Sequence, residues 1–285
     1  MPHATRILFT VLAGIIALVP GSTTISAQAT VDLGNEYSNV GALMVWRVDS
    51  AGKPVELRGF ASGTLIRERV MLTAGHFTAP ATALGSLPPD IRIFASFSPG
   101  DAKDPNTWIP TVRHVTHPSM PHCPPPPQCD PTDDILVAPL QPGIADVGLV
   151  FLERQPAGIA PARLAAPGTL DRSERAPTTI VGYGTTVPRR NAPGAAIADI
   201  WDGKRRVRTS LVRRVVDETW ALWSIPSYVC SGDSGGGIFL NPPPAMGRGV
   251  LVANVSDGGR DCRRQNNNNR LDTTGIQNWI QEKAE

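Results

Sequence analysis

The chain has 285 residues and a formal net charge of +2 at neutral pH. Such a small net charge gives no reason to expect a nucleic acid or an anionic membrane as a partner. Proline and glycine, 28 and 27 residues, are spread along the chain. Helical periodicity is missing until the C-terminus, so we expect short strands joined by turns.

The N-terminus has the order of a secretory signal. Arg6 is followed by an apolar run over residues 7–19, and a small polar stretch ends at Ala27-Gln28-Ala29. This order predicts a signal peptide over residues 1–29 that is removed from a mature chain beginning near Thr30. The apolar run is shorter than the roughly 20 residues that span a bilayer. We therefore expect an extracellular or periplasmic protein with no membrane anchor after the signal is removed.

Runs of β-branched, apolar and aromatic residues recur in two series, each with about enough strands for one small barrel. The first series covers residues 42–48, 59–66, 70–73, 91–97, 109–115 and 135–140; the second covers 178–182, 207–216, 220–225, 237–240 and 249–256. Strand signals are weak over residues 141–167, where we place the crossing. We expect an N-terminal barrel over residues 30–150 and a C-terminal barrel over 151–285. The second ends in a helix with Ile276, Trp279 and Ile280 on one face.

Two groups of polar residues are interpreted as surface features. The run Asn266 to Asn269 is low in complexity and is most simply an exposed turn. His114, His117 and His122 lie in or beside a proline-rich region, which favours surface positions.

The four cysteines favour disulfides rather than metal ligands, because the count is even and the chain carries an export signal. Three pairings are possible. Cys123 and Cys129 flank a proline run and could close one surface loop, which would leave Cys230 and Cys262 to pair. No CxxC or HxxxH spacing supports a zinc site beside His122.

The strongest local motif is Gly232-Asp233-Ser234-Gly235-Gly236, directly before an apolar run. Glycines allow a turn whose backbone N–H groups point into a cleft, as stabilisation of an oxyanion requires. The alternative is a glycine-rich hairpin in which Ser234 and Asp233 only serve the turn.

A serine nucleophile needs a base and a group that orients the base. His76 ends the β-like run Val70 to Gly75, so its imidazole can face a cleft. Asp134 directly precedes the apolar run 135–140 and could be buried beside the ring. Asp133 is adjacent, but successive strand residues face opposite ways, so only one of the two acids can point inward.

These segments resemble the motifs of trypsin/chymotrypsin-like serine proteases. Leu72 to His76 resembles their TAAH histidine motif, residues 134–137 resemble D-[IL]-A-L, and residues 232–236 match the serine motif, in the family's order. Three further segments are similar to the family pattern: Gly63 to Ile66, Gly182-Tyr183-Gly184, and Val255 to Gly258. The resemblance covers about residues 40–280.

The resemblance implies an all-β fold of two antiparallel six-stranded barrels with a short C-terminal helix. It also implies an endopeptidase in which Ser234 is the nucleophile, His76 the general base and Asp134 the orienting acid. The N–H groups of Gly232 and Ser234 would form the oxyanion hole, and Cys230 would pair with Cys262. We expect a monomer that acts on proteins or peptides without a cofactor or metal. The alternative is an inactive binding or adhesion protein of the same fold.

The sequence departs from the family at three points. Ser62 and Phe77 stand where the family has a cysteine pair bracketing the histidine. Family zymogens are cut before an apolar segment whose new amine pairs with the acid beside the nucleophile, here Asp233. The matching segment begins at Val40 but follows Asn39, so we expect either no activating cut or one by a protease that accepts Asn39.

The third departure concerns specificity. The position six residues before Ser234 is Tyr228 rather than an acid. With Ser256 and Gly258 as the other pocket positions, this favours an apolar residue at the cleaved position over lysine or arginine. Arg263 and Arg264 could instead attract an acidic side chain, although surface positions suit them better. An esterase is disfavoured because its histidine would follow the serine in the chain.

Overall fold

The computed structural model describes residues 29–120, 143–186, 200–223, 229–241, 249–257, 262 and 267–285. Residues 1–28 of the expected signal, the expected strand over 135–140 and the residues Cys123, Cys129 and Asp134 lie outside these ranges. Among the described residues, no helix is long and apolar enough to cross a membrane.

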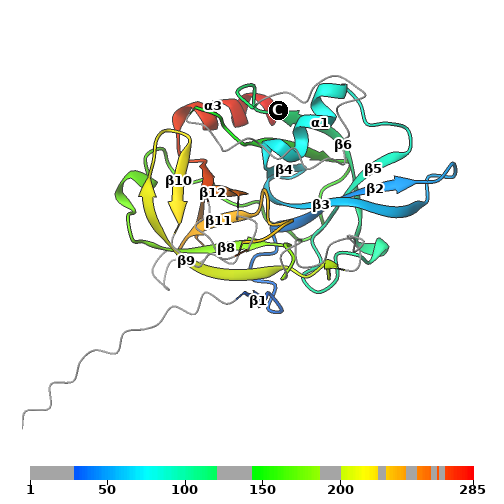
Figure 1. Ribbon diagram of the computed structural model, residues 1–285, viewed down its shortest axis with the longest axis horizontal. Helices are drawn as coiled ribbons and strands as arrows, with labels where there is room; N and C mark the ends of the chain where they lie inside the picture. The colour runs from blue at the N-terminus through cyan, green and yellow to red at the C-terminus, as the bar shows by residue number, and fades with distance from the viewer. Residues whose placement is uncertain are drawn as a thin grey trace, which may run out of the picture.

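The first barrel is closed and antiparallel, with strand order β2-β3-β4-β7-β6-β5 (Figure 1). Its strands are β2 (Val40–Val48), β3 (Pro54–Arg67), β4 (Val70–Thr73), β5 (Ile91–Ser96), β6 (Ile109–Thr116) and β7 (Gly148–Leu152). Helix α1 (Gly75–Leu84) follows β4, and the short 3-10 helix η1 (Pro105–Thr107) precedes β6. Strand β7 comes from the segment that we had interpreted as the crossing between barrels, and it runs past the expected boundary at residue 150.

The second barrel is formed by β8 to β13, and the pairing of β8 with β9 closes it. Its strands are β8 (Pro177–Gly182), β9 (Arg206–Val215), β10 (Trp220–Trp223), β11 (Gly237–Leu240), β12 (Val250–Asp257) and β13 (Asn267–Arg270), with the 3-10 helix η2 (Leu170–Arg172) before them. β1 (Thr30–Val31) adds to the free edge of β9. The prediction of two antiparallel six-stranded barrels is confirmed.

Several polar residues that the sequence places at the surface are buried or half-buried in the structure. Asn267 to Arg270 form β13, and Asn268 and Asn269 are fully buried, so the expectation of an exposed turn is wrong. His114 is half-buried on β6, where burial lowers its pKa to about 4. His117 is also half-buried and packs edge-on against Trp279. His122 lies outside the described residues.

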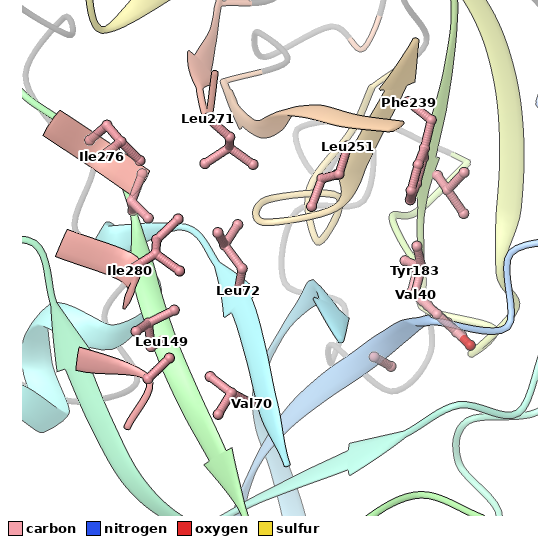
Figure 2. Close-up of a cluster of buried hydrophobic side chains, with 14 of the residues drawn as sticks. Val40, Val70, Leu72, Leu149, Tyr183, Phe239, Leu251, Leu271, Ile276 and Ile280 are labelled. Atoms are coloured by element: carbon pink, nitrogen blue, oxygen red, sulfur yellow. The ribbon is translucent and has the colours of Figure 1, made fainter. Parts of the chain in front are cut away.

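The two barrels share one apolar core with helix α3 (Thr274–Lys283) (Figure 2). Leu72 and Leu149 come from the first barrel and Leu251 from the second, and Ile276 and Ile280 of α3 pack onto the same cluster. The prediction that Ile276, Trp279 and Ile280 share a buried face is confirmed. Burial of apolar surface between the barrels therefore holds them in one relative position.

The start of the described chain is held by a buried ion pair. Arg205 Nε lies 2.9 Å from Asp32 Oδ2, with the two side chains 0% and 3% exposed. Asp32 also accepts hydrogen bonds from the N–H groups of Glu36 and Tyr37, and Arg205 donates to the carbonyl oxygen of Val40. This ion pair joins the N-terminal segment to both barrels.

We predict that Arg205→Met lowers the free energy of unfolding by about 3–5 kcal/mol, because it leaves the Asp32 carboxylate buried without its charge partner. The matched control is Arg206→Met. Arg206 pairs with Asp202, whose side chain is 43% exposed, so its loss should cost under about 1 kcal/mol. Urea unfolding of both variants measures the difference, and equal losses would contradict the prediction.

Candidate active site

His76 lies in the first turn of α1, directly after β4. Its ring Nδ1 lies 2.9 Å from Asp146 Oδ2, and its backbone N–H donates to Asp146 Oδ1 over 2.7 Å. One carboxylate thus binds both the ring and the backbone of the histidine. The proton of the imidazole is held at Nδ1, which leaves Nε2 as the basic nitrogen.

Asp146 is fully buried. Burial by itself opposes ionisation, but the charge of His76 and hydrogen bonds from His76 and the Ser256 hydroxyl outweigh it and lower the pKa of Asp146. The acid is therefore ionised where it can orient His76 and stabilise an imidazolium.

The sequence analysis names Asp134 rather than Asp146 as the acid beside His76. Asp134 lies outside the described residues, and the acid that binds Nδ1 is Asp146, just before β7. A usable signal was present in Asp146-Val147-Gly148-Leu149. The position two residues after the acid must be small, because a Cβ on Gly148 would overlap the Thr78 side chain of α1. The residue two after Asp134 is Leu136, which lacks this property.

The serine loop, residues 232–236, lies against the end of β4. Gly235 has a φ of +80°, and a Cβ there would come within 2.7 Å of the Ala74 backbone nitrogen. Gly232 has a φ of +89°, and a Cβ there would overlap the Phe60 ring. Only glycine fits both the conformation and the space at these positions. The loop that carries half-buried Ser234 therefore meets the first barrel two residues before His76.

The acid beside Ser234 is neutralised by a side chain of β9. Arg208 Nη1 donates to Asp233 Oδ1 over 3.1 Å, and Arg208 Nη2 lies 3.0 Å from Oδ2. The N–H groups of Gly184 and Cys230 also donate to this carboxylate, over 2.8 and 2.9 Å. A Cβ on Gly182 or Gly184 would overlap Asp233. The Gly-Tyr-Gly motif thus makes room for a buried carboxylate that is hydrogen-bonded through both oxygens.

Ser62 stands where the resembled family has a cysteine, and it forms hydrogen bonds instead. Its hydroxyl donates to the Gly232 carbonyl oxygen over 2.7 Å and accepts from the Tyr183 N–H over 2.8 Å. Its backbone N–H donates to the Ser234 carbonyl oxygen over 2.8 Å. These hydrogen bonds connect β3 to the serine loop without a disulfide.

The other predicted site residues have mixed outcomes. The disulfide between Cys230 and Cys262 is confirmed. Ser256 was predicted to line the specificity pocket, but its hydroxyl is bound to Asp146, a role that the sequence analysis missed. Tyr228 and Gly258 lie outside the described residues, as do Arg263 and Arg264. Within the described ranges, no group of three or more His, Cys, Asp or Glu side chains could hold a metal ion.

Comparisons with known proteins agree with this architecture. No family model matches the chain, and no curated protein sequence matches it. Among solved structures, it is similar to neuropsin, a serine protease expressed in mouse brain, with 16% identity over 90% of this chain and 99% of that chain, at a TM-score of 0.57.

Two further structures are similar. HL collagenase shares 17% identity over 87% of this chain and 94% of that chain, and GrC shares 14% over 88% and 95%; both have a TM-score of 0.54. At such identities the likeness establishes the fold. The resemblance seen in the sequence is therefore confirmed in three dimensions: this chain has the two-barrel fold of trypsin/chymotrypsin-like serine proteases.

Proposed function

We propose that the protein is a secreted serine endopeptidase in which Ser234, His76 and Asp146 form the catalytic triad. The observation that carries this proposal is the buried Asp146 carboxylate that binds both Nδ1 and the backbone N–H of His76. The serine loop lies against the end of β4 and Ala74, two residues before this histidine. A histidine held in this way is suited to act as a general base.

The roles follow from general acid–base chemistry. His76 Nε2 takes the proton of the Ser234 hydroxyl while Oγ attacks the peptide carbonyl carbon, and Asp146 stabilises the imidazolium that forms. The N–H groups of Gly232 and Ser234 stabilise the oxyanion. His76 then protonates the leaving amine as the C–N bond breaks. In the second half of the reaction His76 takes a proton from water as the water attacks the acyl carbon, and it returns that proton to Ser234 Oγ as the ester bond breaks.

We further propose that no activating cut is needed. In the resembled zymogens a new N-terminal amine pairs with the acid beside the nucleophile, but here Arg208 supplies the positive charge to Asp233. The peptide bond between Asn39 and Val40 is also poorly placed for a protease. Both residues are buried, and the Asn39 carbonyl oxygen accepts from the Leu65 N–H over 2.8 Å. This favours the first of the two alternatives left by the sequence.

The substrate is proposed to be a protein or peptide. The family resemblance assigns Tyr228 to the base of the specificity pocket and Gly258 to its entrance, and these residue types favour an apolar residue at the cleaved position. Dominant cleavage of a peptide library after lysine or arginine would contradict this. An inactive binding protein remains the alternative, but the paired His76 and Asp146 and the glycines of the serine loop favour an enzyme.

The triad assignment predicts that substitution of Asp146, but not of Asp134, lowers kcat. Asp146→Asn should lower kcat by roughly 10⁴-fold, because it removes the carboxylate that orients His76. The matched control Asp134→Asn should leave kcat nearly unchanged. Labelling by a fluorophosphonate probe should require Ser234 and His76, as tested with Ser234→Ala and His76→Ala. A larger loss in Asp134→Asn than in Asp146→Asn would overturn the assignment.

The role of Arg208 predicts that activity does not depend on a free N-terminal amine. Extending the mature chain by several residues before Thr30 should leave the rate of fluorophosphonate labelling unchanged. Arg208→Met should abolish labelling, because the Asp233 carboxylate is left buried without a charge partner. Loss of activity on extension, restored when the added residues are removed, would show that an amine is needed after all.

A further inference from the structure

Two buried asparagines of the second barrel bind the backbone of the proposed triad acid. Asn269 Oδ1 accepts from the Asp146 N–H over 2.8 Å, and Asn254 Nδ2 donates to the Asp146 carbonyl oxygen over 3.1 Å. The asparagines are opposite each other in the pairing of β12 with β13, and both are fully buried. Both polar groups of one residue's backbone are thus held from the other barrel.

The first barrel's β4–β7 pairing leaves this backbone unsupported. That pairing begins where Thr73 meets Gly148, two residues after Asp146. A buried N–H group without an acceptor is costly, so the amide oxygen of Asn269 removes a penalty that would otherwise fall on Asp146. A buried asparagine also costs free energy unless it is hydrogen-bonded. The Nδ2 of Asn269 donates to the Arg270 carbonyl oxygen over 2.8 Å, so the amide is bonded through both ends.

We propose that Asn269 and Asn254 are positioning residues that act on His76 through Asp146. The two asparagines hold the backbone of Asp146. Ser256, which lies on β12 like Asn254, binds the Asp146 carboxylate. The serine loop and the three residues that bind Asp146 (Asn269, Asn254 and Ser256) all belong to the second barrel. The second barrel therefore fixes the position of Asp146 relative to Ser234. Through Asp146 it also fixes the position of His76. The catalytic consequence rests on the proposed function.

Loss of the hydrogen bond to Asn269 should lower kcat less than loss of the Asp146 carboxylate. Asn269→Leu keeps the approximate volume but removes the acceptor, so the unpaired Asp146 N–H should displace the residue slightly. We expect kcat to fall on the order of tenfold with KM nearly unchanged, which corresponds to about 1.4 kcal/mol in the barrier. Loss of the carboxylate itself should cost roughly 10⁴-fold.

The matched control is Asn268→Leu. Asn268 is the adjacent residue on β13 and is equally buried, but successive strand residues face opposite sides. Asn268→Leu should therefore leave kcat within about twofold of the wild-type value. The second measurement is the far-downfield proton NMR resonance of His76 Nδ1–H, which reports its hydrogen bond to Asp146. This resonance should shift or broaden in Asn269→Leu and stay in place in Asn268→Leu.

Equal effects of the two variants on kcat and on the resonance would overturn the proposal, because they would indicate a purely structural role. If Asn269→Leu does not fold, Asn254→Ala replaces it, since a carbonyl that loses one donor is tolerated better than an orphaned N–H. It should give the same pattern, and an unchanged resonance would overturn the proposal. The resonance does not depend on turnover. A wild-type protein that shows it but resists the fluorophosphonate probe would refute the proposed function and leave the asparagine contacts testable.

Discussion

The structure of the site depends on one buried carboxylate, Asp146. An ionised acid removed from water costs several kcal/mol unless its oxygens are hydrogen-bonded. Its partners come from different elements: His76 from α1 and Ser256 from β12 bind the carboxylate, and Asn269 from β13 binds the backbone. The acid is satisfied only when the two barrels are docked. The orientation of the histidine is therefore a property of the complete fold.

A second buried carboxylate, Asp233, applies the same constraint to the serine loop. It is surrounded by the Arg208 guanidinium and two backbone N–H groups, and glycines at 182 and 184 leave the space that it occupies. Asp233 lies directly beside Ser234, so its hydrogen bonds also limit the conformations open to the serine. Gly182 and Gly184 are explained by the volume of one acid rather than by turn formation.

Much of this could be predicted because its signals are local. The recurrence of short strands predicted the barrels, and compact motifs singled out His76 and Ser234 as candidate site residues. The acid was missed because a carboxyl group before an apolar run is a common pattern. The choice between Asp134 and Asp146 depends on the contact of Gly148 with Thr78, which are far apart in the sequence. The asparagine run was misinterpreted for a related reason. A polar strand is expected at the surface unless a buried polar group faces it from elsewhere, as Asp146 faces Asn269.

The arginines at the start of β9 connect the first described residues to the serine loop. Arg205, just before the strand, binds Asp32 and the Val40 carbonyl oxygen, and Arg208 binds Asp233. A terminal amine would have to be created by cleavage and inserted before it could neutralise Asp233. A guanidinium on a strand is present as soon as the second barrel folds, and it offers a planar fork that matches both carboxylate oxygens. The N-terminal segment then needs only to be held in place by Arg205. Under the proposed function, the charge partner of Asp233 is therefore Arg208 whichever residue begins the chain.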